Sequence, residues 1–495
     1  MFSKQQRQTY RTTNGPGTNY LRNAVRSRIY SGDTETEERL VAYQLYWQFY
    51  VGKHWAENND KLLSFNYCKA IVDKVVNFMV GKTGFELNVE DTWGELVDSE
   101  VVEKPLESLL NYVWRKNRKK LILTKMLQMG SVSGDLFVYL YPDVRKGYVV
   151  IDVLDSRTTI PVFEKGDYTK VKKWRIVKAL GDNDKNYTAR VIEYEVNLRR
   201  EYYVKDTSEN ADKYEMVEIP NDLGFIPIIH IQNSPNSASF GGFSDLVDIL
   251  KLNKIYNEMA EDVKQIIDYY AAPTTVVTGA TVGNLKRGVD QIWSGLPAEA
   301  NVQVLSLGED LSASQTFLTS LKNAMHDMTG VPEEVLSKVQ HISNTSAAAL
   351  QMLYQSLIQA ADKKAMTYGE GIVEINRMLL VLMTKYFKEE LDIVKRLPEN
   401  AKTNTEQYFE RFWVSPAFIY NLPSDRLMQL QEAQLELNMK IGSRQEVMER
   451  LGKRNIPVIE KQIEDDLEFL KLVTEASQPV VTQSGGAFNE PPPPS

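Results

Sequence analysis

One long amphipathic helix constrains this fold more than any other feature. It is predicted from Asp245 to Tyr270, inside the stretch GFSDLVDILKLNKIYNEMAEDVKQIIDYYAAP. Its apolar residues form two rows with a spacing of seven, and Asn253 interrupts the second row. The rows are Ile249, Tyr256, Val263 and Tyr270, and Leu246, Ala260 and Ile267. At about 1.5 Å per residue the helix would span about 39 Å, and a seven-residue repeat predicts packing along other long helices.

The other faces of this helix contain more acidic than basic side chains and few residue types that perform catalysis. The carboxylates are Asp248, Glu258, Glu261, Asp262 and Asp268, and the cations are Lys251, Lys254 and Lys264. The helix is therefore not expected to contribute a catalytic centre.

Length and composition are those of an ordinary globular chain. With 495 residues, of which 43% are hydrophobic and 25% charged, two to four subdomains are expected. No apolar run approaches the roughly 18–20 residues of a membrane helix, and the N-terminus lacks the apolar segment of a secretory signal. We therefore expect no membrane partner.

Cysteine content and charge limit the function further. Cys68 is the only cysteine, which excludes an intramolecular disulfide and a cysteine-based zinc site and favours a reducing, cytosolic environment. The formal net charge is −8, whereas a protein that grips DNA tightly normally has a basic surface. Any DNA contact is therefore expected to be loose or localised.

The predicted elements form a helical region, a β region and a second helical region. A basic arm over 1–35 precedes them, and a solvated tail is favoured there over an arm that orders against an acidic neighbour or nucleic acid. The helices are expected over 37–50, 66–81, 103–129, 312–329 and 347–388, with short ones over 424–475. Strands are expected in one antiparallel region over 137–220, over 224–233, and in a small insert over 274–310. Residues 477–495, ending in EPPPPS, are predicted to be disordered.

No motif supports an enzyme. VGKTG ends like a phosphate-binding loop, but its first glycine is replaced by Val76, and the preceding residues are helical. The four histidines lack metal-ligand spacing, and His230 is interpreted as a core histidine because its strand is apolar. The basic run WRKNRKK is interpreted as a solvated helix face. We expect no catalytic, cofactor or metal site.

The order of elements resembles the portal proteins of tailed bacteriophages, in the branch typified by siphophage head-to-tail portals. Two helices flank a small insert, and an irregular loop and a longer helix follow. YWQFYVGKHW and NYCKAIVDKVVNFMVGK are similar to the N-terminal part of that family. GSVSGDLFVYLY and FIPIIHIQNSPNSASFGGFSDLVDILKLNKIYNEMAEDV resemble the approach to its first stem helix, and FLTSLKNAMHDMTGVPEEVL resembles the second. The resemblance covers about residues 37–475.

The resemblance implies a mainly helical α+β fold that assembles as a ring around a central channel. The implied regions are an N-terminal arm (1–35), a wing (36–240), stem helix 1 (241–271), a clip (272–310), stem helix 2 (311–330), a tunnel loop (331–345), a long helix with the wing return (346–420), a crown (421–476) and a tail (477–495).

The implied function is a conduit for DNA without an active site. Twelve copies at one capsid vertex would pass double-stranded DNA non-specifically during packaging and ejection. The implied partners are the terminase large subunit, a neck or adaptor protein, and the major capsid and scaffolding proteins. The protein would assemble in the host cytoplasm and reside in the virion.

The resemblance also suggests residues that contact DNA or partners. Acidic channel walls would let DNA slide, with sparse rings of lysine. The expected stem lining is Lys254, Glu258, Glu261 and Lys264, and the expected tunnel-loop contacts are Lys338, Gln340, His341 and Asn344. An alternative of equal weight is that the tunnel loop packs against the loop of a neighbouring copy. The expected clip contacts are Lys286, Arg287, Trp293 and Leu296.

Two other classes of protein remain as alternatives. A ring-shaped nucleic-acid translocase would need a phosphate-binding loop, which Val76 interrupts. Another virion structural protein, such as a neck or minor capsid protein, would not be expected to have a helix–insert–helix pattern.

Overall fold

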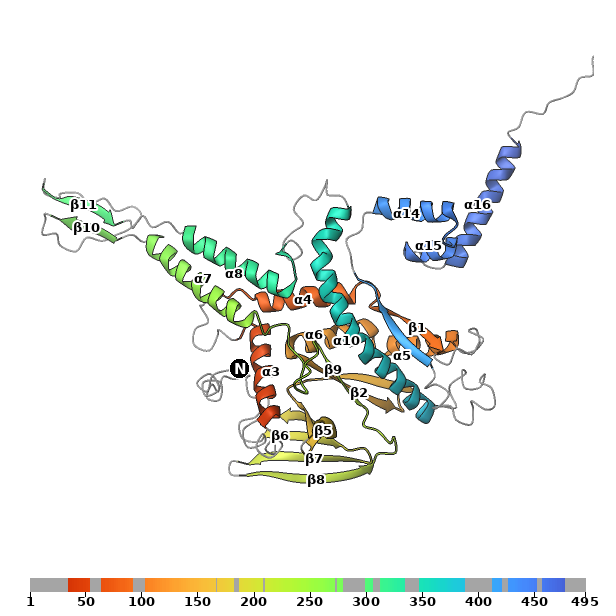
Figure 1. Ribbon diagram of the computed structural model, residues 1–495, viewed down its shortest axis with the longest axis horizontal. Coiled ribbons are helices and arrows are strands. Elements are labelled where there is room, and N and C mark those ends of the chain that lie inside the picture. The colour runs from red at the N-terminus through yellow and green to blue at the C-terminus, as the bar shows by residue number, and fades with distance from the viewer. Residues whose placement is uncertain are drawn as a thin grey trace, which may run out of the picture. The chain divides into compact units, whose positions relative to one another are not determined.

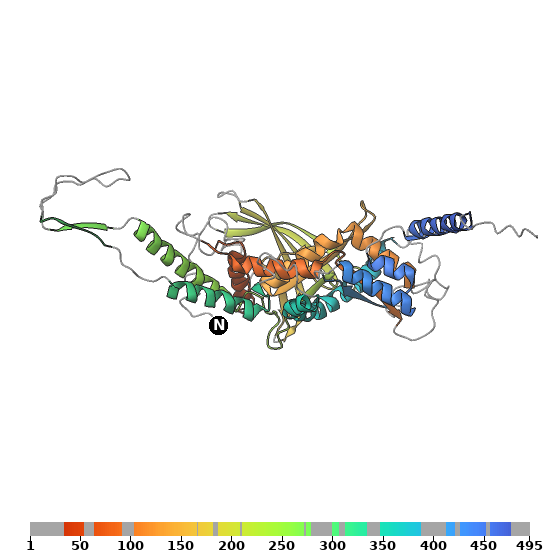
Figure 2. The ribbon, with the colours of Figure 1, turned by 90° about the horizontal axis from the view of Figure 1, so that it is seen from above.

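The structure is a computed structural model, shown as ribbons in Figures 1 and 2. It divides into two units, residues 1–344 with 351–422 and residues 345–350 with 423–495, which we describe separately. The described residues are 34–53, 64–91, 103–165, 167–181, 187–207, 210–271, 274–278, 299–305, 312–333, 347–387, 412–420, 426–451 and 456–476. The predictions for residues 1–33 and for the tail over 477–495 lie outside these ranges.

The first unit begins with α3 (Thr34–Tyr50) and α4 (Tyr67–Val80), close to their predicted bounds. Asn66 caps α4, because its side-chain oxygen accepts a hydrogen bond from Lys69 N at 2.9 Å. Gly81, with φ of 52°, ends the helix. The predicted apolar face of α4 is buried; it comprises Ile71, Val75, Phe78 and Met79. Gly81 is thus a helix terminator, and VGKTG is no phosphate-binding loop.

The single helix predicted over 103–129 is wrong, because the chain forms two helices there. They are α5 (Glu103–Lys116) and α6 (Lys119–Ser133). Arg118 has a left-handed backbone with φ of 59°, which the helical repeat cannot accommodate. The bend leaves the apolar faces of both helices buried, and apolar periodicity alone therefore gave no sign of the break.

The β region forms two antiparallel sheets rather than one. The first, in the order β3-β2-β9, comprises β2 (Asp135–Asp143), β3 (Tyr148–Leu154) and β9 (Ile228–Gln232). The second, in the order β4 to β8, comprises β4 (Thr159–Glu164), β5 (Asp167–Gly181), β6 (Tyr187–Tyr194), β7 (Leu198–Thr207) and β8 (Asn210–Pro220). A turn separates β3 from β4, where Asp155 accepts hydrogen bonds from the backbone and guanidinium of Arg157. The chain changes sheets at this turn.

Aromatic side chains fill the space between the two sheets. Phe137 on β2 lies edge-on to Trp174 on β5, with ring centroids 5.2 Å apart. His230 on β9 stacks between Phe137 and Phe240, and its Nε2 lies 2.7 Å from Asp135 Oδ1. The interpretation of His230 as a hydrogen-bonded core histidine is confirmed.

A third pairing joins distant parts of the chain and was not predicted. Strand β1 (Phe85–Asp91) pairs with β12 (Phe412–Phe418), so that Phe85 lies opposite Phe418. Asn376 anchors this ribbon: it donates to Val414 O at 3.1 Å and accepts from Trp114 Nε1 at 2.8 Å. Both strands are short and more than 300 residues apart, and no local pattern could pair them.

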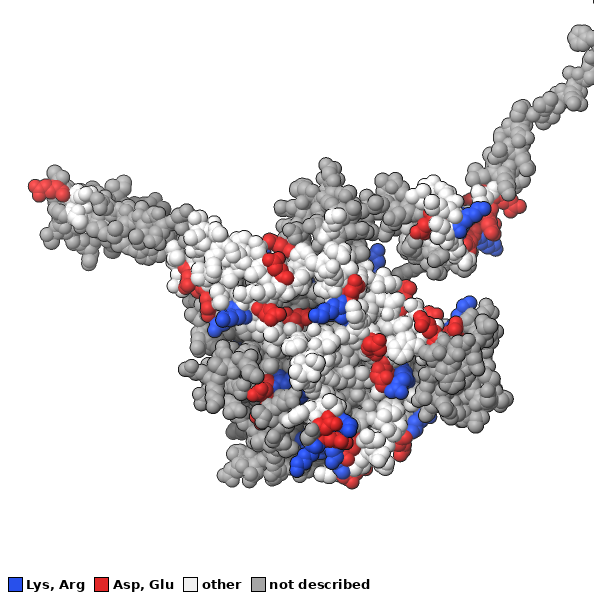
Figure 3. All heavy atoms as spheres, viewed as in Figure 1, with Lys and Arg blue, Asp and Glu red and all other residues white. Residues whose placement is uncertain are grey.

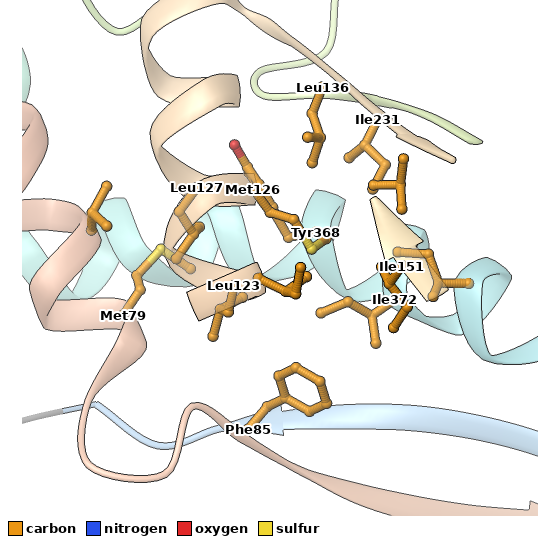
Figure 4. Close-up of a cluster of buried hydrophobic side chains, with 14 of the residues drawn as sticks. Met79, Phe85, Leu123, Met126, Leu127, Leu136, Ile151, Ile231, Tyr368 and Ile372 are labelled. Atoms are coloured by element: carbon orange, nitrogen blue, oxygen red, sulfur yellow. The ribbon is translucent and has the colours of Figure 1, made fainter. Parts of the chain in front are cut away.

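The long helix α10 (Ala347–Phe387) matches its prediction to within one residue. Its buried face, from Leu357 to Phe387, joins the main hydrophobic core of the first unit. Figure 4 shows this core, where Tyr368 and Ile372 of α10 meet Leu123, Ile151 and Phe85. The core fixes α10 against α6 and the three-stranded sheet.

Within the described residues from 426 to 476, the second unit forms three helices, and two or three short helices were predicted over 424–475. They are α14 (Arg426–Met439), α15 (Arg444–Arg450) and α16 (Ile456–Ala476). Ala433, Val447 and Ile456 are buried, one on each helix. The fold as a whole mixes helix and sheet, which agrees with the predicted fold class at that level.

Candidate functional site: the paired helices α7 and α8

Two helices with an insert between them form the candidate site. They are α7 (Leu250–Ala271) and α8 (Ser312–Thr329), and they run side by side in both views (Figures 1 and 2). In the insert, β10 (Thr274–Thr278) pairs antiparallel with β11 (Asn301–Leu305). The helix predicted over Ser312–Thr329 is confirmed, as is a β element in the insert.

The first helix begins five residues later than predicted. Residues 245–249 form a turn, in which Leu250 N and Ile249 N both donate to Leu246 O. Lys364 and Asn233 bind the carboxylate of Asp245, and these contacts fix the turn that precedes α7. With 22 residues, α7 spans about 33 Å rather than about 39 Å.

Two buried asparagines fasten the first half of α7 to the backbone at the start of α4 and just before it. Asn257 accepts a hydrogen bond from Phe65 N at 2.6 Å and donates to Phe65 O at 3.1 Å. Asn253 accepts from Tyr67 N at 3.1 Å. Asn253 therefore does not merely interrupt an apolar row, because it satisfies a backbone donor in the core.

A buried polar cluster, which we call the polar root, holds the chain just before α7. It comprises Ser131, Asn233, Asp245, Lys364 and Tyr368. Lys364 Nζ on α10 lies 2.7 Å from Asp245 Oδ2, 2.5 Å from Asn233 Oδ1 and 3.0 Å from Ser131 Oγ. Tyr368 donates to Asn233 Oδ1 at 2.9 Å, and burial raises the pKa of its phenol well above the ordinary value. The polar root thus joins α6 and α10 to the residues that directly follow β9 and precede α7.

Two glycines allow the backbones beside the polar root to approach closely. A Cβ on Gly134, whose φ is 88°, would lie 2.6 Å from Gly242 O and 2.8 Å from Ser244 N. Asp135 follows Gly134 and is fully buried; its Oδ1 accepts from Gly242 N at 2.9 Å, and its Oδ2 accepts from the phenol of Tyr43. The GSVSGD and GGFSD segments therefore meet in space.

The end of α8 is closed by its own side chains. His326 Nδ1 lies 2.8 Å from Val331 O, and Lys322 forms an ion pair with Glu333, which lowers the pKa of that carboxyl. Gly330, with φ of 66°, makes the turn. This turn leads toward the segment for which a tunnel loop was predicted.

The predicted stem-lining residues all lie on α7. Lys254 Nζ is 3.8 Å from Glu258 Oε1, and Lys264 Nζ is 3.6 Å from Glu261 Oε1 and 3.3 Å from Asp268 Oδ2. The lysines are thus partnered by carboxylates of the same helix. Figure 3 shows acidic and basic side chains interspersed on the face that it displays.

The distal half of α7 has fewer packing partners than the first half. Ala260 is buried, but Ile267 is 50% exposed, and Phe317 near the start of α8 is 46% exposed. Apolar side chains this exposed on adjacent helices are candidates for contact with another chain. Among the described side chains of the two heptad rows, burial is thus greatest up to Ala260 and is lost at Ile267.

The remaining site predictions lie outside the described residues. They are the tunnel-loop residues Lys338, Gln340, His341 and Asn344 and the clip residues Lys286, Arg287, Trp293 and Leu296. Sequence reasoning also overlooked Lys364 and Asp245. The sequence does contain one indication of a buried cation, since Lys364 lies near Ala361 and Ala365 within the predicted helix.

Within the described ranges, no three histidine, cysteine or carboxylate side chains gather as they would around a metal ion. Across the same part of the chain, none of the helices has the length and hydrophobicity needed to span a membrane.

Comparison with known proteins decides the family. The sequence profile of the family described as "Phage portal protein, SPP1 Gp6-like" matches residues 18–466. This chain belongs to that family. As a phage portal protein it is a structural component of the virion, at the portal vertex of the capsid.

Solved structures similar to this portal protein come from gene transfer agent (GTA) particles. The neck of a native GTA particle computed with C12 symmetry matches with 12% identity and a TM-score of 0.40, over 78% of this chain and 89% of that chain. The neck of an empty GTA particle computed with C6 symmetry matches with 11% identity and a TM-score of 0.42, over 78% and 90%. Among curated protein sequences, no match was found.

Proposed function

We propose that this portal protein forms a ring of about twelve copies, through which genomic DNA passes during packaging and ejection. The helix pair α7 and α8 is the observation that carries the proposal. Its base is fixed by the polar root and by Asn253 and Asn257, and an insert joins its two helices. Repeated around an axis, such a pair gives a continuous helical wall. The number of copies is the expectation for the family.

The charges of α7 suit a wall along which DNA slides. A lysine with a carboxylate neighbour at 3.3–3.8 Å attracts phosphate less than a free lysine. Because tight DNA binding depends on cations that displace the counterions of phosphate, partnered lysines keep the contact weak. We assign the channel lining to Lys254, Glu258, Glu261 and Lys264 on this basis.

The other regions follow from the same assignment. Residues 272–310 would form the clip that docks the terminase large subunit and later the neck or adaptor protein, with Trp293 as an anchor. Residues 331–345 would form the tunnel loop, and residues 421–476 the crown. The wing and crown would face the major capsid and scaffolding proteins.

Exposed apolar side chains on the helix pair support contact between copies. In the ring, Ile267 and Phe317 would be covered by the helix pair of the neighbouring copy. Changing both to glutamate would bury charge at that interface and shift the protein toward monomer. Val144, exposed in the turn between β2 and β3, is the matched control, since its change to glutamate should leave assembly unchanged.

Electron microscopy of the purified protein tests the proposal. Top views should show a ring with a central hole and about twelve-fold symmetry. A population of monomers or solid particles in wild-type protein, under conditions that keep it folded, would contradict the proposal. In procapsids, the variant Lys254→Glu with Lys264→Glu should reduce the amount of nuclease-protected DNA if these lysines face the channel.

An ATPase assay separates the conduit from a translocase. Val76 is buried in α4 and Gly81 ends that helix, which leaves this stretch without a loop to cradle phosphate. We expect no DNA-stimulated ATP hydrolysis from the purified portal.

A further inference from the structure

Five cations surround the junction of α5 and α6, which we call the basic corner. They are Arg115, Lys116, Arg118, Lys119 and Lys120. The cluster contrasts with a formal net charge of −8 for the whole chain. Among the residues that the structure describes, no carboxylate forms an ion pair with any of the five. Within the described residues, the basic corner is therefore a local cluster of cations without ion-pair partners.

The backbone of the basic corner is rigid. Asn117 donates to Val149 O at 2.9 Å and accepts from Ile151 N at 2.9 Å, and both partners belong to β3. Asn117 also donates to Val113 O at 2.9 Å. The corner is thus fixed to the three-stranded sheet, and its cations project from a preformed surface rather than from a loose loop.

The start of α6 is electrostatically unfavourable in the free protein. Its cap residue is Arg118, which has a left-handed backbone and provides no side-chain acceptor, and its first turn contains no acidic residue. Lys119 and Lys120 instead add positive charge at the positive end of the helix dipole. A bound anion would relieve this conflict, because helix N-termini favour phosphate and carboxylate groups. A local conflict of this kind is typical of a binding site.

A hollow of about 510 Å³ lies over the corner. Its lining is Asn111, Arg115, Arg118, Lys119, Lys120 and Leu121. Four of these six residues are cations. The hollow therefore offers several positive groups to one ligand.

Lys119 lies deeper than its neighbours. Its Nζ lies 4.2 Å from the centre of the Phe85 ring. Burial lowers its pKa, and Glu86 and Glu107 oppose the effect without cancelling it. An anion at the hollow would stabilise this partly desolvated ammonium.

We propose that the basic corner binds the phosphate backbone of duplex DNA outside the channel. Arginine and lysine side chains together with a helix N-terminus are the usual groups that bind DNA phosphates. An acidic protein segment would need apolar anchor pockets as well, and Leu121 is the one apolar residue in the lining. In Figures 1 and 2, α5 lies on the side of the first unit away from α7 and α8. On the proposed function, in which α7 and α8 surround the channel, DNA at the basic corner would be distinct from DNA in the channel.

Binding of relaxed closed-circular duplex DNA to the full-length protein tests the proposal, because a closed circle cannot be threaded through a ring. The test variant carries Arg115→Gln, Arg118→Gln and Lys120→Gln, three exposed changes that leave Asn117 intact. The matched control carries Lys125→Gln, Lys172→Gln and Lys363→Gln, which remove the same charge from exposed positions outside the hollow. Arg115→Lys with Arg118→Lys keeps the charge and should retain binding. Unfolding curves establish that all variants fold.

Salt dependence gives the expected magnitudes. If one copy engages all five cations, raising salt from about 50 to 200 mM should weaken wild-type binding about 500-fold. The test variant, with two cations left, should lose about 12-fold over the same range, whereas the control should behave as wild type. A variant with Lys254→Gln and Lys264→Gln should also bind the circle as wild type does, which separates this site from the channel.

Two outcomes would overturn the proposal. One is equal weakening by the test and control variants, which would mean that binding follows total charge alone. The other has two parts: the test variant loses binding to polyglutamate that the control variant keeps, and the two variants bind circular DNA equally. The occupant would then be an acidic protein segment.

Discussion

The buried ion pair of the polar root allows a quantitative test of how the helix pair is anchored. The substitution Lys364→Met removes the ammonium group, which lies 2.7 Å from Asp245 Oδ2 and 2.5 Å from Asn233 Oδ1. Breaking a buried pair from one side generally costs about 3–5 kcal/mol. The Asp245 side chain remains 25% exposed and keeps its hydrogen bond from the Asn233 amide, so we expect the lower end, about 3 kcal/mol.

The expected loss can be measured as a change in Tm. At about 2.1 cal/mol/K of unfolding entropy per residue, a unit of about 400 residues would lose about 3–4 °C. Calorimetry at one fixed protein concentration is the assay, because assembly stabilises the folded state. The control is Lys363→Met, because Lys363 is the exposed neighbour of Lys364, and this variant should change Tm by less than about 1 °C.

A double-mutant cycle then isolates the pair. Asp245→Asn alone should cost about 2 kcal/mol, and combined with Lys364→Met the total should fall short of additivity by about 1–2 kcal/mol. Additive losses, or a Tm for Lys364→Met within 1 °C of wild type, would refute the view that this pair fastens α7 to α10.

Three further predictions concern stability. Gly134→Ala should lower the free energy of unfolding by about 3 kcal/mol or more, because its Cβ would lie 2.6 Å from a backbone atom. Gly224→Ala, which also has positive φ but lies in open space, should lower it by about 1 kcal/mol. Equal losses in thermal unfolding would contradict this. Burial opposes ionisation of Glu193, but the cations beside it, Arg175 foremost at 2.6 Å, outweigh it and lower its pKa. The stability that Glu193 adds is therefore present above about pH 4.3 and is lost as pH falls through its lowered pKa, so the Tm gap between wild type and Glu193→Gln should narrow below about pH 4. Asn257→Ala should cost about 2 kcal/mol and speed hydrogen exchange of the residue 65 amide, and unchanged exchange there would count against the asparagine attachment.

Much of the helical framework could be predicted from the sequence, because its signals are local. The second helix of the pair and the long α10 have strong periodicity and match their predictions closely. The β strands were also recognisable, but the turn at Asp155 that divides them into two sheets depends on a side-chain interaction rather than on apolar pattern. Pairing of β1 with β12 is a contact between distant segments, and single-sequence periodicity contains no information about it.

The candidate site was harder to foresee because its anchoring groups are polar residues in apolar surroundings. Asn253 read as a defect in a heptad row, yet it accepts a hydrogen bond from the backbone of Tyr67. Lys364 was not singled out in the sequence, yet it is 7% exposed and contacts Ser131, Asn233 and Asp245. The sequence alone does not show whether a polar residue on an apolar helix face is tolerated or required, because the answer depends on which distant group it contacts.

The attachment of α7 at its root has a mechanical consequence. A helix fixed over its first half by asparagines and the Lys364–Asp245 pair, with Ile267 exposed beyond them, is a cantilever. A sideways load at its distal end, where the insert begins, acts through a lever arm of several helical turns and produces a torque at the root. There the ammonium of Lys364 is the link to α10, the helix that follows the predicted tunnel loop. Force applied where the insert begins is thus passed to α10 through the Lys364–Asp245 pair and the other contacts of the polar root.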